Sequence, residues 1–183
     1  MELEKLNGTI IGVVKNVSED ISHKLVKDMI NNKASASLKM VGLNDSYLNL
    51  YIDELSYRDY QKVLLASKLH DKVIILNNFS KGLLKKDIEF FKILFRKITE
   101  YDRKIIIIDK NAEMFFGLVD NIYVFNEDEI IYETNDIYDK KLEEFIDLPM
   151  VVKFVDISFS KNVKVNHYKE FDELLKAVYR IKS

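Results

Sequence analysis

Two amide side chains, Asn77 and Asn78, directly follow an apolar run over residues 73–76. Such a run is typical of a parallel strand that is buried on both faces. Carboxylates placed directly after a strand can hold a divalent cation and orient a water molecule for attack on a phosphate. The two amides have a similar shape, but they carry no charge and are much weaker bases. Taken alone, the pair predicts an ordinary polar turn after a buried strand.

Other residues of catalytic types have simpler explanations. Ser56 and Asp59 stand three positions apart, which is the spacing of a helix cap. The three histidines of the chain are scattered without a second ligand at helical spacing, so we expect no metal site. The acidic residues 127–129 fall in a predicted hairpin turn, where charge is expected. We therefore expect no catalytic residue.

Composition limits the class of protein. The chain has 183 residues, of which 48% are hydrophobic, and this is enough for one full core. A net charge of −2 gives no reason to expect a nucleic-acid partner. The absence of cysteine excludes disulfides and thiolate metal sites. No apolar run approaches the roughly 20 residues that span a bilayer, and residues 1–8 do not resemble a signal peptide, so we expect a cytoplasmic protein.

The hydrophobic pattern predicts an α/β fold. Residues 9–14, 72–76 and 104–108 are apolar runs typical of buried parallel strands. Helices are predicted from Ser56 to His70 and over residues 85–101, which together with the strands give a right-handed crossover. The other expected elements are a helix over 19–31, a polar connector over 32–37, a hairpin over 126–131, and C-terminal helices over 147–157 and 169–181.

Two segments carry a resemblance to ATP-binding-cassette (ABC) ATPases. Residues 55–66 read LSYRDYQKVLLA and resemble the signature motif LSGGQ with its following helix. Residues 74–84 read IILNNFSKGLL and resemble the Walker B strand and D-loop, LLLDEPTSGLD. Tyr57 and Arg58 replace the two signature glycines after Leu55 and Ser56. Asn77 and Asn78 replace the Asp that holds magnesium and the Glu that polarises water in that family.

The phosphate-binding loop is the most altered part of this resemblance. Residues 12–23 read GVVKNVSEDISH, where an active cassette has a glycine-rich loop ending in Lys-Ser-Thr. Without gaps, only Gly12 and Ser22 match, and Ile21 stands at the position of the phosphate-binding lysine. Two acidic residues precede Ile21 at a predicted helix N-terminus, where they suit the helix dipole and repel a triphosphate. We therefore expect no bound nucleotide and no other cofactor.

Downstream segments continue the resemblance in order. Residues 104–113 read KIIIIDKNAE and resemble the H-loop region, with Lys110 at the position of the switch histidine. A lysine is a flexible point charge and cannot replace a neutral imidazole. Residues 118–125 read LVDNIYVF and resemble the strand that follows the H-loop.

A narrower resemblance is to the ATPases of energy-coupling-factor (ECF) transporters. It is carried by residues 38–55, by the Asp-Leu-Pro segment at 147–149 and by the closing amphipathic helix over 169–181. In those ATPases the tail helices pack between subunits. Fewer residues separate His23 from Leu55 here than in a working cassette, so most of the helical subdomain and of the groove for the membrane subunit is missing.

Together the resemblances imply a P-loop NTPase-like (ABC ATPase-like) fold. It would have a mostly parallel sheet flanked by helices, a reduced helical subdomain and a small helical C-terminal extension. We expect a degenerate ATPase-like domain over residues 1–137 and the extension over 138–183.

The implied function is that of a pseudo-ATPase rather than an enzyme, paired with itself or with a related ABC ATPase. Peripheral contact with a membrane transporter subunit at the inner face of the cell membrane is a secondary expectation. Two alternatives stay open: a subunit that lends its signature helix to a partner's ATP site, and an unrelated α/β interaction module.

Overall fold

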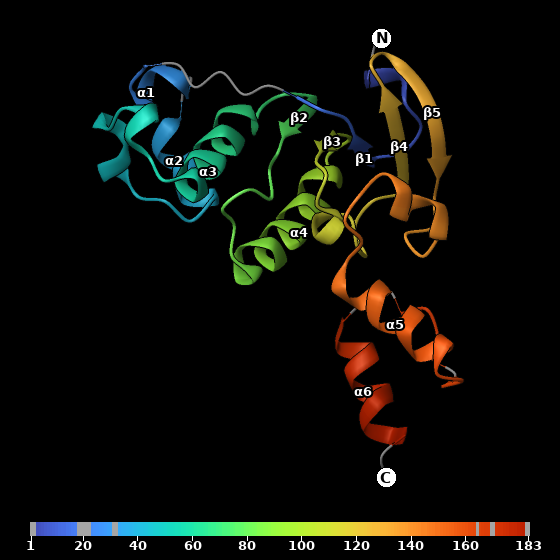
Figure 1. Ribbon diagram of the computed structural model, residues 1–183. Helices are drawn as coiled ribbons and strands as arrows, with labels where there is room; N and C mark the ends of the chain where they lie inside the picture. The colour runs from blue at the N-terminus through green and yellow to red at the C-terminus, as the bar shows by residue number, and fades with distance from the viewer. Residues whose placement is uncertain (1–2, 18–22, 31–32, 164, 169–170, 182–183) are drawn as a thin grey trace.

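The computed structural model describes residues 3–17, 23–30, 33–163, 165–168 and 171–181. Five strands form one sheet, and helices gather beside and below it (Figure 1). The strands are β1 (Ile10–Val14), β2 (Val73–Asn77), β3 (Lys104–Ile108), β4 (Asn121–Asn126) and β5 (Glu129–Thr134). The α-helices are α1 (Val26–Met29), α2 (Ala34–Met40), α3 (Tyr57–Lys68), α4 (Lys85–Thr99), α5 (Met150–Ser160) and α6 (Phe171–Ile181). Short 3-10 helices are η1 (Leu3–Lys5), η2 (Asp45–Asn49), η3 (Ile52–Glu54), η4 (Ala112–Met114) and η5 (Lys140–Glu144).

The sheet has the strand order β2-β3-β1-β4-β5. The first four strands are parallel, and β5 pairs with β4 in an antiparallel hairpin. The three predicted strands are confirmed within one residue at each end. The hairpin predicted over 126–131 is confirmed in place, but its strands are longer and extend from Asn121 to Thr134. Because β3 lies between β1 and β2, the carboxyl ends of all three meet at one edge of the sheet.

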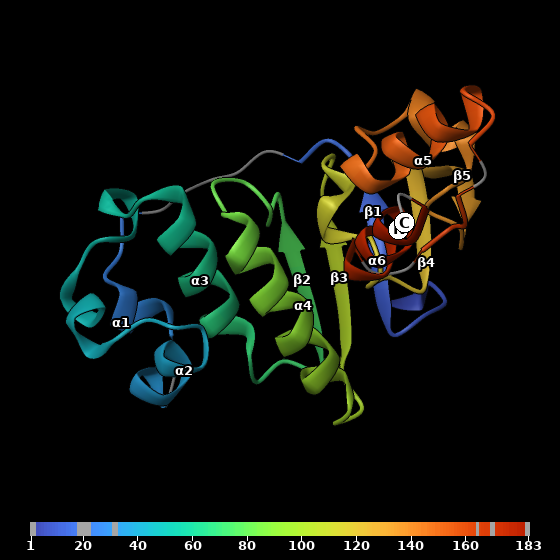
Figure 2. The same cartoon turned by 90° about the horizontal axis from the view of Figure 1, so that it is seen from below.

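The two faces of the sheet are covered unequally. The larger hydrophobic cluster joins one face to α3, α4 and α5, and Figure 2 shows α3 and α4 side by side, with α4 next to β2. The smaller cluster covers the other face, where Leu3, Leu6 and Val17 are the partners from outside the strands in the described part of the chain. Val73 and Ile75 stay half-buried because β2 is an edge strand, so the expectation of full burial on both faces is wrong for this strand.

The predicted helix over residues 19–31 is confirmed only at Val26–Met29, and it is wrong for the other residues that the structure describes between 23 and 30. Residues 18–22 and 31–32 lie outside the described residues, and only Val26–Met29 is helical in between. The backbone around Leu25 is extended and pairs with Tyr51, with Val26 N donating to Leu50 O at 3.0 Å. Long-range backbone pairing therefore overrides the local helical pattern.

The predicted polar connector over residues 32–37 is wrong as well, because α2 begins at Ala34. Leu38 and Val41 are fully buried in the larger cluster, which also contains Val63 of α3. Packing of these apolar side chains against α3 explains why this short segment is helical. The reduced helical subdomain thus consists of α1, α2, η2, η3 and α3.

An ion pair joins the N-termini of α3 and α4. Arg58 Nε and Nη2 donate to the two carboxylate oxygens of Asp87, each at 2.7 Å. Asp87 also accepts from Leu84 N at 3.0 Å, and Lys62 Nζ lies 3.7 Å from it. The Asp87 side chain is buried, and the hydrogen bonds from Arg58 are the main reason that its pKa lies below the ordinary value.

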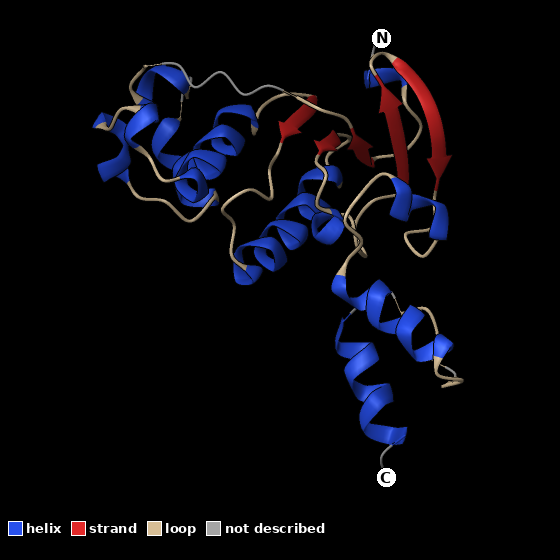
Figure 3. Ribbon diagram, viewed as in Figure 1, coloured by secondary structure: helices blue, strands red, loops and turns tan. Residues whose placement is uncertain are grey.

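The two C-terminal helices extend away from the sheet (Figures 1 and 3). Both predicted helices are confirmed, with Pro149 directly before α5. Val151, Val152 and Val155 of α5 are buried in the larger cluster, whereas α6 buries Leu174 and leaves Leu175 exposed. The boundary between residues 137 and 138 stays a prediction. Among the described helices, none has the length and apolar character needed to cross a bilayer.

Two glycines with positive φ form a matched pair for testing the α3–α4 junction. Gly82 has a φ of +77°, and a Cβ there would lie 2.9 Å from Tyr57 Cβ and 3.1 Å from Arg58 N. Gly42 has a φ of +76° with open space around it. We expect Gly42→Ala to lower the free energy of unfolding by about 1–2 kcal/mol, because the only cost there is the strain of an alanine backbone held in the left-handed conformation. Gly82→Ala should lose about 1–3 kcal/mol more through overpacking.

Urea unfolding of the two variants measures this difference. Equal losses in both would contradict the close approach of Gly82 to the first turn of α3.

The Asp87 ion pair predicts a pH-dependent contribution to stability. The folded-state pKa of Asp87 lies below its ordinary value of 3.8, so the ionised carboxylate stabilises the fold above about pH 4. That contribution is lost as the pH falls through the folded-state pKa. We expect Asp87→Asn to lower the melting temperature by roughly 5 °C at pH 7, because Arg58 and Lys62 then lack their counter-charge.

The gap between the melting temperatures of the parent and of Asp87→Asn should narrow below pH 4. Asp71→Asn, at an exposed carboxylate, is the control and should leave the melting temperature nearly unchanged. A gap for Asp87→Asn that is the same at pH 3 and pH 7 would refute this account.

Candidate functional site

A cavity of about 490 Å³ lies at the carboxyl ends of β1, β2 and β3. Ligands of open α/β sheets commonly bind at this edge. Two of the predicted site residues, Asn78 and Lys110, line it. The other lining residues are Lys15, Asn16, Val17, Ser80, Lys81, Gly82, Asp109 and Asn111.

Asn78 is held by its own backbone and by its neighbours. It has a φ of +47°, a conformation that Asn tolerates better than most residues. Its N–H donates to Ile108 O at 2.7 Å, and its carbonyl accepts from Gln61 Nε2 at 3.2 Å. Asn78 thus fixes the end of β2 to β3 and to α3, which is a structural role at the predicted position.

Asn77 is the last residue of β2, half-buried beside the same edge. Its Oδ1 is buried and accepts no hydrogen bond from the described residues. An amide oxygen of this kind can accept hydrogen bonds, but it carries no charge with which to neutralise a divalent cation as a carboxylate does. The paired amides therefore supply no negative charge to the cavity.

The sequence analysis did not identify Asp109 as a site residue. It follows β3 directly and is 5% exposed. Asp109 Oδ2 accepts from Ser80 N at 2.8 Å, and its Oδ1 accepts from Asn111 N at 3.0 Å. The carboxylate therefore fastens the loop after β2 to the end of β3. Its position directly after an unbroken run of isoleucines was the available signal.

Two of the three lysines in the cavity have partners within the chain. Lys15 Nζ lies 2.9 Å from Asp128 Oδ1, and its hydrogen bond lowers the pKa of Asp128. Lys81 Nζ lies 3.8 Å from the centre of the Tyr57 ring. Lys110, the third lysine, is exposed, and its backbone carbonyl accepts from Asp147 N at 3.3 Å.

The signature-like residues are also engaged with their own chain. Ser56 Oγ accepts from Asp59 N at 3.1 Å and donates to Asp59 Oδ2 at 2.9 Å, which confirms the predicted cap. Arg58 is committed to Asp87, whereas Tyr57 is exposed beneath Lys81. Tyr57 and Arg58 thus contact the loop after β2 and the start of α4.

The phosphate-loop comparison needs a correction at Gly12. Gly12 lies in the middle of β1, paired with Ile107 and Ile122, and is not the first residue of a loop. A Cβ at this position would lie 3.2 Å from the Phe115 ring, so close packing explains the glycine. The loop that lines the cavity begins at Lys15. Ile21 and Ser22 lie outside the described residues.

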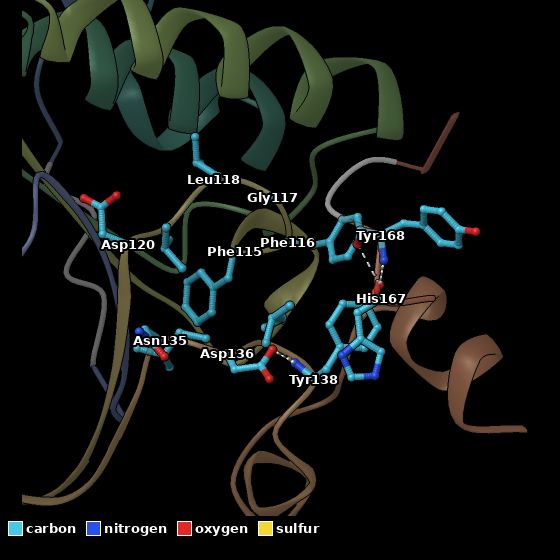
Figure 4. Close-up of a pocket in the computed structure, with 13 residues that line it drawn as sticks. Phe115, Phe116, Gly117, Leu118, Asp120, Asn135, Asp136, Tyr138, His167 and Tyr168 are labelled. Atoms are coloured by element: carbon cyan, nitrogen blue, oxygen red, sulfur yellow. Dashed lines mark hydrogen bonds between the residues drawn. The ribbon is translucent and has the colours of Figure 1, made fainter. Parts of the chain in front are cut away.

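A second cavity, of about 520 Å³, lies beside the start of β4 (Figure 4). The Tyr138 ring stacks on His167 with centroids 4.1 Å apart, and Tyr138 Oη donates to Tyr168 O at 2.7 Å. Burial raises the pKa of Tyr138. Asp120 accepts from Thr9 N at 2.7 Å. These groups bond to one another and to backbone, so the arrangement fixes the loops around the cavity.

His23 has a local structural partner. Its Nδ1 lies 2.8 Å from Asp53 Oδ2, and its ring stacks on Tyr51 with centroids 4.2 Å apart. Within the described residues, His, Asp and Glu side chains form no group of three or more that could hold a metal ion.

No protein-family model matches the chain, and no curated protein matches it. The solved structures similar to it include ATP-binding cassettes. The ADP conformation of MJ1267, an ATP-binding cassette of an ABC transporter, matches 75% of this chain and 67% of that chain, with a TM-score of 0.51 and 13% sequence identity.

The MJ0796 cassette bound to ADP and Pi matches 56% of this chain, with a TM-score of 0.49 and 23% identity. The matched part spans 45% of that cassette's length. The fold of this chain is therefore that of an ABC ATPase-like α/β domain, with a mostly parallel sheet flanked by helices, as the sequence predicted.

Proposed function

We propose that this chain is a pseudo-ATPase that acts as a non-catalytic binding or regulatory partner, paired with itself or with a related ABC or ECF ATPase. One observation carries the proposal. At the sheet edge where a cassette would hold metal and phosphate, the chain supplies the amides Asn77 and Asn78 in place of carboxylates. Phosphoryl transfer depends on charges placed around the metal and the phosphate, and the amides provide none.

The remaining charges at this edge support the same conclusion. The carboxylate of Asp109 accepts two backbone N–H groups, and Lys15 is paired with Asp128. Lys81 lies over an aromatic ring. A triphosphate would have to displace contacts that already stabilise the fold. We therefore assign no catalytic residue, no metal and no cofactor to the chain.

The contacts of Ser56 argue against ATP hydrolysis in trans. In that alternative, Ser56 and the N-terminus of α3 would meet the phosphates of a partner's nucleotide. The Ser56 hydroxyl already caps α3 and bonds to Asp59, and Tyr57 with Lys81 occupies the adjacent surface. The ABC ATPase-like fold likewise argues against an unrelated interaction module.

Exposed apolar side chains on the C-terminal extension support the pairing role. On α5, Met150, Phe154 and Ile157 recur at helical spacing and are 70%, 42% and 54% exposed. On α6, Leu175 and Tyr179 are 38% and 72% exposed. Clustered apolar side chains on a protein surface mark contact sites for other proteins. The resemblance to ECF ATPases, whose tail helices pack between subunits, favours the same surface.

The proposal also covers location and domain organisation. We place the protein in the cytoplasm, with peripheral contact to a membrane transporter subunit through a partner ATPase. Residues 138–183 would be the pairing extension, and residues 1–137 the degenerate cassette. A nucleic-acid partner has no support in the net charge of −2.

The lost charges predict that Mg-ATP does not bind at millimolar concentration. A ligand at about 100 times its dissociation constant would add about 2.7 kcal/mol to the free energy of unfolding. We expect no rise in melting temperature with Mg-ATP relative to magnesium sulfate at equal ionic strength. An intact cassette ATPase measured in parallel is the positive control.

A rise of several degrees with Mg-ATP would contradict the proposal. ATP turnover by the double variant Asn77→Asp/Asn78→Glu would do so as well, because it would show that the rest of the catalytic site is present.

The exposed face of α5 predicts self-association or pairing with an ABC ATPase. At tens of micromolar, we expect a dimer by sedimentation velocity, either of the chain alone or of its mixture with an intact ATPase encoded beside it. Met150→Lys/Ile157→Lys should convert that dimer to monomer, because both side chains are exposed and their replacement spares the core.

Tyr101→Lys is the matched control, since Tyr101 is 75% exposed at the end of α4. It should leave the dimer intact. A strict monomer in both samples would remove the pairing role from the proposal.

A further inference from the structure

Lys92 is a mostly buried lysine of α4 whose side chain lines a cavity, and no carboxylate of the described residues forms an ion pair with it. Lys92 is 7% exposed, and it forms neither a hydrogen bond nor an ion pair with any residue in the described ranges. Its Nζ lies 5.7 Å from the centre of the Phe116 ring. Burial of an ammonium without a partner is costly. Consistent with this, burial lowers the pKa of Lys92.

Lys92 lines a cavity of about 320 Å³ between α4, the loop at Phe116 and the first turn of α6. Two more cations of α4 line the same cavity. Lys85 Nζ lies 4.1 Å from the centre of the Phe171 ring, and Arg96 Nη2 donates to Gly117 O at 2.6 Å. Positions 85, 92 and 96 lie on one side of the helix, because they are seven and four residues apart.

Two carboxylates also face this cavity. Glu89 and Asp172 line it, and both are exposed to solvent. Three cations against two carboxylates leave the lining with a net charge of +1 (3 − 2). Glu113 also acts on Lys92 through its charge, but its carboxylate accepts from Met150 N at 2.8 Å. Solvent screens the exposed carboxylates Glu89 and Asp172 more than it screens the mostly buried Lys92, so the part of the cavity beside Lys92 favours an anion.

We propose that this cavity binds a small organic anion with a carboxylate or phosphate head group on a flat apolar body. Lys92 and Arg96 would hold the head group, since a guanidinium and an ammonium both form charge-assisted hydrogen bonds with such oxygens. The apolar body would lie against Phe116 and Phe171. The cavity is at the small end of the range for metabolite sites. It shares no lining residue with the cavity at the carboxyl ends of the strands.

Calorimetric titration with three probes tests the site: phenyl phosphate, benzoate and inorganic phosphate, each at constant ionic strength. We expect phenyl phosphate or benzoate to bind with an affinity that falls about 10- to 100-fold in Lys92→Met, the loss of one charge-assisted hydrogen bond. Methionine fills the volume of the lysine stem, so this variant should keep its fold. Lys97→Met removes an exposed lysine outside the cavity and should bind like the parent.

The side-chain ammonium of Lys92 gives a second readout in the unmutated protein. Its pKa, followed by nuclear magnetic resonance of labelled lysine, should rise when the organic anion binds. Phenyl phosphate and benzoate tell a phosphate-selective site from a carboxylate-selective one. The proposal would be overturned if neither phenyl phosphate nor benzoate bound, or if Lys92→Met bound them as tightly as the parent does. It would also be overturned if inorganic phosphate bound as tightly as phenyl phosphate.

Discussion

The bidentate ion pair between Arg58 and Asp87 joins the two helices that cover the sheet. Asp87 accepts hydrogen bonds from the Arg58 guanidinium in the first turn of α3 and from Leu84 N directly before α4. One buried carboxylate therefore contacts the N-termini of both helices. A carboxylate at this position also complements the positive ends of α3 and α4. Gly82 lets the loop after β2 pass close to α3. The position of the loop that lines the candidate site therefore depends on the contact between Arg58 and Asp87.

Periodicity predicted the parts of the fold that depend on local pattern. The apolar runs became β1, β2 and β3 because each is long enough for one strand and buried by its neighbours. The segment between His23 and Leu55 was not predictable in the same way. Leu25 pairs with Tyr51 across 26 residues of chain, and α2 is helical because Leu38 and Val41 pack against α3. Contacts of this kind between distant residues do not produce a repeating hydrophobic pattern in a short segment.

The position of the candidate site in the fold was predictable from the sequence, but the roles of its residues were predictable only in part. Strand ends at Asn77 and Ile108 meet at one edge because the strands are parallel, and this follows from the order of elements. The role of Asp109 depends on Ser80, which is 29 positions away, and that of Gly12 on the ring of Phe115. The apolar pattern placed Gly12 in a strand over residues 9–14, whereas the resemblance placed it at the start of the phosphate-binding loop. The Phe115 ring shows why a strand needs a glycine there.

The last strand of the sheet limits how two copies of this chain can meet. β5 is an edge strand, and its outer backbone groups could template a further strand. Glu129 and Glu133 are exposed on opposite faces of β5, because the register with β4 shifts and leaves Ile131 without a partner residue in that strand. The irregularity at Ile131 would disturb continuous pairing with a further strand, and the exposed glutamates add charge to this edge. Continuous extension of the sheet from one molecule to the next is therefore disfavoured, and the chain is protected from fibre growth along this edge.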